Sequence, residues 1–199
     1  MLNLSSNLIL AIYLIPTLIG FFIVSPWGSL LTSSLKQRFP SLETTRGQLL
    51  GGLKLISLAG FAVSAQTLWI SSKISEGGSF CSTNETFSCD DLLGNSELNV
   101  DPIFGLSWGL IGMAVNALLL FIVFVLQQER NHPLAERLIN MGLLTTGVGI
   151  LVIGLLVSYE IQEQRICLYC TTAHIANIAA LVGFFRLKKV YDNNSEWNK

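Results

Sequence analysis

Charged residues are scarce in this sequence. Aspartate, glutamate, lysine and arginine make up 13% of its 199 residues, whereas soluble domains carry about a quarter. Hydrophobic residues make up 51%, and the mean hydropathy is +0.56. The deficit excludes an ordinary water-soluble domain, and the lack of a basic, aromatic-rich surface excludes a nucleic-acid partner. The composition therefore predicts an integral membrane protein in contact with the lipid bilayer.

The apolar residues gather in five long runs, with most charged residues between them. Each run approaches the roughly 20 residues that an α-helix needs to cross a bilayer. The runs cover residues 8–24, 49–70, 103–126, 138–159 and 171–187. We therefore expect an all-α, multi-pass membrane protein with about five helices.

No basic residue precedes Lys36. A secretory signal peptide needs a positively charged start, so we expect the first run to be retained. We expect this run to span the membrane, since proline is tolerated in membrane helices, with a re-entrant or interfacial helix as the alternative. Pro102 sets the expected start of the third run.

Basic residues are nearly absent from one side of the expected topology. With the N-terminus outside, the outer side receives only Lys73 and Arg165. The inner side receives the other ten: Lys36, Arg38, Arg46, Lys54, Arg130, Arg137, Arg186, Lys188, Lys189 and Lys199. Because basic residues favour the cytosolic side, all four cysteines are expected on the other face, which is periplasmic, otherwise extracytoplasmic, or lumenal. Disulfides form in such compartments.

Cysteines are also few, but two of the four stand in a C-x-x-C pattern. Cys167 and Cys170 lie at the mouth of the fifth run. This spacing places both sulfurs in a first helical turn, where free N–H groups and the helix dipole stabilise a thiolate. The pattern is typical of a redox dithiol, with a metal-binding half-site or two incidental cysteines as alternatives. We expect Cys170 to lie deeper in the membrane and Cys167 closer to water.

The other pair, Cys81 and Cys89, lies in the long acidic segment 73–102. Residues 90–93 are expected to form a short surface helix that ends at Gly94. Two cysteine pairs on one face are compatible with two structural disulfides, a four-thiolate zinc site, or an electron relay from an outside protein. The location argues against zinc, because thiolates outside the cytosol tend to be oxidised.

A relay needs an electron acceptor, and membranes supply lipid-soluble quinones. Cys170 is the sulfur expected to meet a quinone within the helices. His174 follows at i+4 on the same face, where an imidazole can hydrogen-bond a quinone oxygen or deliver a proton. A histidine satisfied by a neighbouring helix is the alternative. Asn177, at i+7, is a further candidate contact or a helix–helix hydrogen-bonding group.

These features together resemble the vitamin K epoxide reductase family, including its bacterial, archaeal and plastid members. The resemblance rests on a cysteine loop after one helix, the sequence 102-PIFG-105 before the next, a third helix on short loops, and 167-CLYCTT-172 opening a fourth. It covers roughly residues 49–187. The resemblance is specific because three features agree: the order of the two cysteine pairs, the number of helices between them, and their common face.

The resemblance implies a four-helix bundle around a quinone, which is ubiquinone, menaquinone or plastoquinone. It implies that electrons pass from a thioredoxin-fold or other periplasmic or lumenal thiol protein to the loop pair, then to the C-x-x-C pair, then to the quinone. Disulfides are thereby generated outside the cytosol. It makes all four cysteines catalytic: Cys81, Cys89, Cys167 and Cys170. It also adds Phe104 and Asp101 to His174 and Asn177 as quinone-binding candidates.

Two departures from the family accompany this resemblance. Residues 1–48 form an extra N-terminal membrane segment and cytosolic loop, ahead of a catalytic domain at 49–187 and a cytosolic tail at 188–199. In addition, His174 stands where well-known members place an aromatic residue, and Asp101 stands near where some carry an asparagine. We therefore expect reduction of a plain quinone rather than of vitamin K epoxide.

Two other interpretations remain at this stage. The other quinone-linked disulfide-generating family of bacterial membranes also has four helices and two cysteine pairs, but its C-x-x-C lies in the first outer loop, the reverse of this order. A non-catalytic subunit of a larger membrane complex, with its cysteines joined in structural disulfides, is compatible with the extra helix and with the glycine-rich helix faces.

Overall fold

The computed structural model describes residues 4–28, 42–80, 86–129, 133–193 and 197. These residues form α-helices, loops and two isolated β-bridges, which confirms the predicted all-α class. The helices are α1 (Leu4–Val24), α3 (Thr45–Ser75), α4 (Cys89–Leu93), α5 (Trp108–Gln128), α6 (Ala135–Glu163) and α7 (Leu168–Asp192). Cys81 lies outside the described residues.

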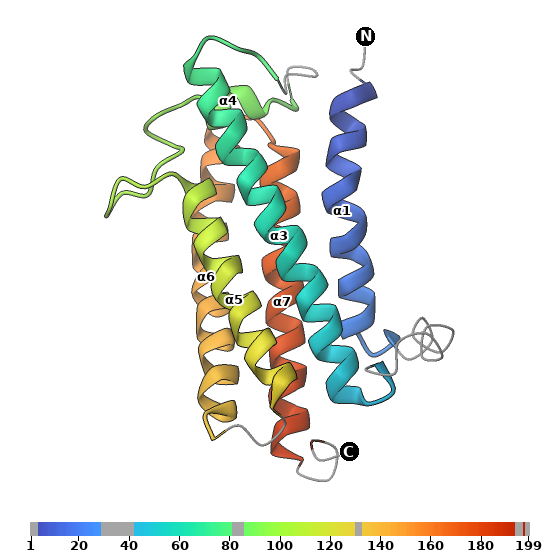
Figure 1. Ribbon diagram of the computed structural model, residues 1–199. Coiled ribbons are helices and arrows are strands. Elements are labelled where there is room, and N and C mark those ends of the chain that lie inside the picture. Colours follow the sequence, from blue (N-terminus) through green and yellow to red (C-terminus); the bar gives the residue numbers. More distant parts are fainter. Residues whose placement is uncertain (1–3, 29–41, 81–85, 130–132, 194–196, 198–199) are drawn as a thin grey trace.

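Four long helices form an up-and-down bundle, and α1 lies against it (Figure 1). Helix α3 is central and packs against α5, α7 and α1, while α6 closes the bundle against α7 and α5. Helix α1 also contacts α7. The short α4 and the junction between α6 and α7 lie at the same end of the bundle, opposite the C-terminus (Figure 1).

The helices α3, α5, α6 and α7 are long and apolar enough to cross a membrane. Helix α1 has a shorter apolar stretch, Leu8–Val24, so a spanning role for the first run stays a prediction. Polar contacts attach α1 to the bundle: the Tyr13 hydroxyl donates to Gln66 Oε1 at 3.2 Å, and the Arg186 guanidinium donates to the Val24 carbonyl oxygen.

Two clusters of buried side chains hold the helices together. The larger one includes Leu53, Ile56 and Phe184, and it joins α1, α3, α5, α6 and α7. The smaller cluster lies at the end that carries α4 and contains Cys89 and Cys167 together with apolar side chains. The two cysteine-bearing segments are therefore packed into one core at one end of the bundle.

Helix α5 begins later than the sequence predicts. Its first residue is Trp108, capped by the Ser107 hydroxyl, so the expected start directly after Pro102 is wrong. The Asp101 carboxylate accepts hydrogen bonds from the backbone N–H groups of Ile103, Phe104 and Leu106 at 2.9–3.0 Å. These bonds satisfy the donors in a loop, and the left-handed conformation of Gly105 (φ 67°) also prevents a helix there.

Helix α4 confirms the predicted short surface helix. The Ser88 hydroxyl accepts from the Asp91 N–H at 3.3 Å, as expected for an N-cap, and Gly94 ends the helix. This helix places Cys89 at its first residue. The cap and the glycine, both local signals, make this short element predictable.

Candidate active site

The C-x-x-C motif opens a helix, as the sequence predicts. Cys167 is the N-cap of α7, and its Sγ accepts a hydrogen bond from the Cys170 N–H at 3.3 Å. Cys170 therefore lies in the first turn of the helix. Both sulfurs are within one turn of each other, the spacing that a redox dithiol requires.

Burial dominates the surroundings of Cys167. Its side chain is fully buried (0% exposed), whereas Cys170 is partly exposed and lines a cavity, so the relative depth of the two sulfurs in the membrane stays a prediction. Burial is the largest influence on the Cys167 thiol and raises its pKa well above the usual range. Desolvation of the thiolate thus outweighs the stabilising N–H groups of the helix start, and Cys167 rests as a thiol.

Cys89 from the loop pair lies beside Cys167. The Cys167 thiol interacts with the side chains of both Cys89 and Cys170, and Cys89 is itself only 2% exposed. The loop is fixed to the start of α7 by two further contacts. The Ile166 N–H donates to the Thr86 carbonyl at 2.9 Å, and Asp91 pairs with Arg165 at 3.2 Å. Cys89, Cys167 and Cys170 therefore form one continuous series of thiols.

Cys170 lines a cavity of about 470 Å³. Helices α3, α5, α6 and α7 form its walls, and the lining is mostly apolar. Of the predicted quinone-binding residues, His174 and Asn177 line it together with Cys170. The Nε2 atom of His174 is buried and makes no hydrogen bond among the described residues. An apolar cavity with a few polar groups is the usual form of a site for an organic ligand.

Two asparagines face this cavity from opposite walls. Asn177 on α7 donates from Nδ2 to the Thr146 carbonyl at 3.1 Å, and Asn116 on α5 donates to the Gly112 carbonyl at 2.9 Å. Both line the cavity. Sequence reasoning missed Asn116, although a polar side chain in the middle of an apolar run is itself a signal of a functional or helix-contacting role.

Asp101 and Phe104 do not line the cavity. Phe104 lies in the loop before α5 and is 77% exposed. The carboxylate of Asp101 is buried against the same loop, where the N–H of Phe104, with those of Leu106 and Ile103, holds its pKa below the usual range. In this arrangement Asp101 shapes the loop, and the prediction that either residue binds quinone remains untested.

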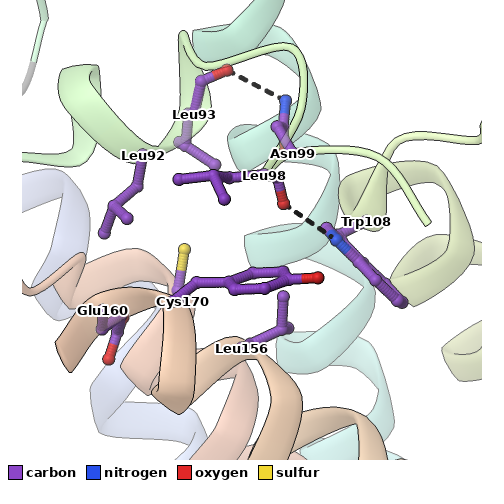
Figure 2. Close-up of a pocket in the computed structure, with 9 residues that line it drawn as sticks. Leu92, Leu93, Leu98, Asn99, Trp108, Leu156, Glu160 and Cys170 are labelled. Atoms are coloured by element: carbon purple, nitrogen blue, oxygen red, sulfur yellow. Dashed lines mark hydrogen bonds between the residues drawn. The ribbon is translucent and has the colours of Figure 1, made fainter. Parts of the chain in front are cut away.

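A second, smaller cavity of about 50 Å³ is also lined by Cys170 (Figure 2). Its lining includes Glu160 of α6, Asn99 of the loop before α5, and Trp108, the first residue of α5. Asn99 Nδ2 donates to the Leu93 carbonyl at 2.9 Å, and Trp108 Nε1 donates to the Leu98 carbonyl at 3.1 Å. Sequence reasoning missed these three residues, because they meet Cys170 only through helix packing and the folding of the loop.

Comparison with known proteins agrees with this arrangement. The model of the Vitamin K epoxide reductase family matches residues 53–184. The chain belongs to this family. No curated protein and no solved structure matches the chain. Members of the vitamin K epoxide reductase family are quinone-dependent thiol/disulfide oxidoreductases, so the chain is a membrane-bound enzyme of that class. The resemblance drawn from the sequence is confirmed at the level of the family.

The residues of this chain fit the quinone that the vitamin K epoxide reductase family uses. The cavity beside Cys170 is apolar and is bounded by helices that are long enough to cross the bilayer. His174 Nε2, a buried atom in this cavity that has no hydrogen-bond partner within the described part of the chain, is suited to a ligand oxygen. A quinone supplies this reaction with an acceptor for two electrons and two protons.

Proposed function

We propose that this protein takes electrons from the thiols of a thioredoxin-fold protein and passes them to a membrane quinone. The path runs through Cys81 and Cys89, then through Cys167 and Cys170. The observation that carries the proposal is the position of Cys167, whose thiol interacts with both Cys89 and Cys170. Cys170 in turn lines the cavity that contains His174.

The transfer between the two pairs is a thiol–disulfide exchange. Cys89 loses its proton and its thiolate attacks the sulfur of Cys167 in the Cys167–Cys170 disulfide, which forms a Cys89–Cys167 bond and releases the sulfur of Cys170, which takes up a proton and becomes a thiol. Cys81 then attacks Cys89, which re-forms the loop disulfide and releases Cys167. The C-x-x-C pair has gained the two electrons that the loop pair has lost. The contact between Cys89 and Cys167 supports this order of attack.

Within the cavity, His174 and Asn177 are proposed to bind the quinone. The imidazole Nε2 is positioned to donate a hydrogen bond or a proton to a quinone oxygen, and Cys170 is the thiol nearest to that site along α7. The apolar walls exclude water and accommodate an organic ring.

Cys81 is the sulfur proposed to meet the partner protein. Because Cys89 and Cys167 are both buried, neither is open to the active-site cysteine of another protein in this conformation. Cys81 follows Gly77 and Gly78, and Gly77 has a left-handed backbone (φ 88°) that glycine adopts readily. The proposal therefore assigns partner exchange to Cys81 and internal exchange to Cys89.

A reconstituted assay tests the function directly. In lipid vesicles, the protein is expected to oxidise a reduced thioredoxin-fold protein only when an analogue of ubiquinone, menaquinone or plastoquinone is added. Loss of partner thiols and loss of quinone absorbance are measured together. The Cys81→Ser variant is expected to lose this activity, because the partner then has no exchange site. Quinone-independent thiol loss, or full activity of Cys81→Ser, would contradict the proposal.

We also propose that the end carrying the cysteines faces the periplasm or a lumen. The uneven distribution of basic residues supports this orientation. In reduced intact cells, membrane-impermeant maleimide is expected to label Cys81 without lysis. A cysteine placed in the tail by Ser195→Cys, in a Cys81→Ser background, is the control and should be labelled only after lysis. The opposite pattern would reverse the orientation.

A further inference from the structure

We infer that Glu160 is the proton acceptor for the Cys170 thiol. This inference rests on the proposed function, in which Cys170 delivers electrons to the quinone, and it assigns the group that prepares the sulfur for that step. Glu160 lies in the last turn of α6, and one of its carboxylate oxygens accepts a hydrogen bond from the Cys167 N–H at 3.3 Å. The carboxylate is thereby fixed at the start of the C-x-x-C turn.

Cys170 lies where the two cavities meet. Leu93, Trp108, Leu156 and Cys170 line both cavities. Glu160 lines only the small one, and His174 lines only the large one. Figure 2 shows Cys170 below Leu92 and Leu93, with Glu160 and Leu156 on the α6 side of the same space. Cys170 thus borders both the small cavity, which Glu160 also lines, and the large cavity that holds the proposed quinone site.

The small cavity offers a path for the proton. Its volume of about 50 Å³ exceeds the roughly 10–15 Å³ that a bridging water molecule requires. Glu160 is the only acidic residue among the described residues that line either cavity. The neighbouring groups that can also titrate or carry charge are Tyr159 in the same lining, the three buried or partly buried cysteines, and the Asp91–Arg165 ion pair, whose charges offset each other.

The S–H bond of Cys170 breaks, its proton moves to the Glu160 carboxylate, and the electron pair stays on the sulfur. When the Cys167–Cys170 disulfide closes, two thiols have lost two electrons and two protons, which is what an oxidant such as a quinone gains. Glu160 then gives up its proton and returns to the carboxylate. A general base of this kind typically contributes about 10²–10⁴-fold in rate.

The Glu160→Gln variant tests the inference without a quinone. Glutamine keeps an oxygen that can accept from the Cys167 N–H, but it cannot take a proton at neutral pH. Fully reduced, quinone-free protein is oxidised with diamide, which itself accepts two electrons and two protons. Trypsin cleaves after Arg165 and Arg186, so mass spectrometry of peptide 166–186 follows the Cys167–Cys170 disulfide alone.

We expect the disulfide to form at least roughly tenfold more slowly in Glu160→Gln than in the natural protein near pH 6.5. The difference should shrink towards about pH 9, because hydroxide then replaces the lost base. Glu163→Gln, an exposed position three residues further along α6, is the matched control and should behave like the natural protein. Glu160→Asp keeps a carboxylate and should keep the natural pH dependence at a lower rate; it also serves if Glu160→Gln does not fold.

Equal rates in Glu160→Gln and the natural protein, or a deficit that does not change with pH, would overturn the inference and leave Glu160 a structural residue. The same variants are then assayed for quinone reduction. A protein whose diamide oxidation depends on Glu160 but which reduces no quinone would overturn the proposed function alone. Quinone reduction by Glu160→Gln at the natural rate would overturn the inference alone.

Discussion

Replacing Cys170 by serine should abolish quinone reduction and trap a disulfide between Cys89 and Cys167. The serine hydroxyl cannot form a disulfide or pass electrons to the quinone. In this variant the Cys167 thiol attacks Cys89 in the Cys81–Cys89 disulfide, which forms the Cys89–Cys167 bond and releases Cys81 as a thiol. The variant lacks Cys170, the internal thiol that would break this bond from the α7 side. Because the Cys167 thiol already contacts the Cys89 side chain, little movement is needed to form this bond. We expect turnover to fall below detection.

Non-reducing tryptic mapping of Cys170→Ser measures the trapped bond. Both loop cysteines fall in peptide 74–130 and Cys167 falls in peptide 166–186, so the trapped species joins these two peptides. After oxidation with diamide, the Cys81→Ser, Cys170→Ser double variant should still carry the link, whereas adding Cys89→Ser instead should remove it. A link that survives Cys89→Ser, or Cys167 found unpaired while Cys81–Cys89 stays closed after partner is added, would contradict the relay.

Replacing His174 by phenylalanine should lower turnover at least roughly tenfold, on the scale of a lost proton donor or hydrogen-bond donor. The ring removes the only nitrogen that lies buried in the cavity without a hydrogen bond among the described residues, and it keeps an aromatic side chain of similar shape. The helix should therefore remain packed. Rates of quinone reduction are compared at equal amounts of membrane-inserted protein, with the disulfide state of both pairs as a check on folding.

His174→Gln provides the matched comparison. Its amide can donate a hydrogen bond to a quinone oxygen but cannot deliver a proton at neutral pH. If hydrogen bonding is the role, glutamine should restore part of the lost rate; if proton delivery is the role, glutamine should be as slow as phenylalanine. Normal turnover in His174→Phe would instead show that the histidine is structural.

The predictable parts of this protein are those set by local sequence. Hydropathy indicates where the long helices lie, because apolar side chains on any face of a membrane helix are stable in contact with lipid. The short α4 follows from a serine cap and a terminating glycine, and the C-x-x-C turn follows from its own spacing. The i+4 relation of Cys170 and His174 places both on one helix face, and both line the large cavity.

The features that sequence missed depend on contacts between segments. The loop before α5 interrupts an apolar run because one carboxylate, that of Asp101, accepts hydrogen bonds from three backbone N–H groups. A hydropathy profile does not predict such hydrogen bonds. Asn116 and Glu160 reach the region around Cys170 only because α5 and α6 pack beside α7. The low exposure of Cys167 has the same origin, since α4 covers a helix start that would otherwise meet water.

The burial of Cys89 and Cys167 protects the proposed relay from reaction with small thiols in solution. Attack on a sulfur requires approach along the bond that breaks, and neither sulfur offers such a path to a molecule in bulk water while it stays 2% or 0% exposed. A small thiol present in large excess is therefore excluded by access rather than by redox potential. Cys89 and Cys167, the two middle sulfurs of the proposed relay, are thus shielded from thiols in solution. Exchange with other molecules is left to the two outer sulfurs, Cys81 and Cys170.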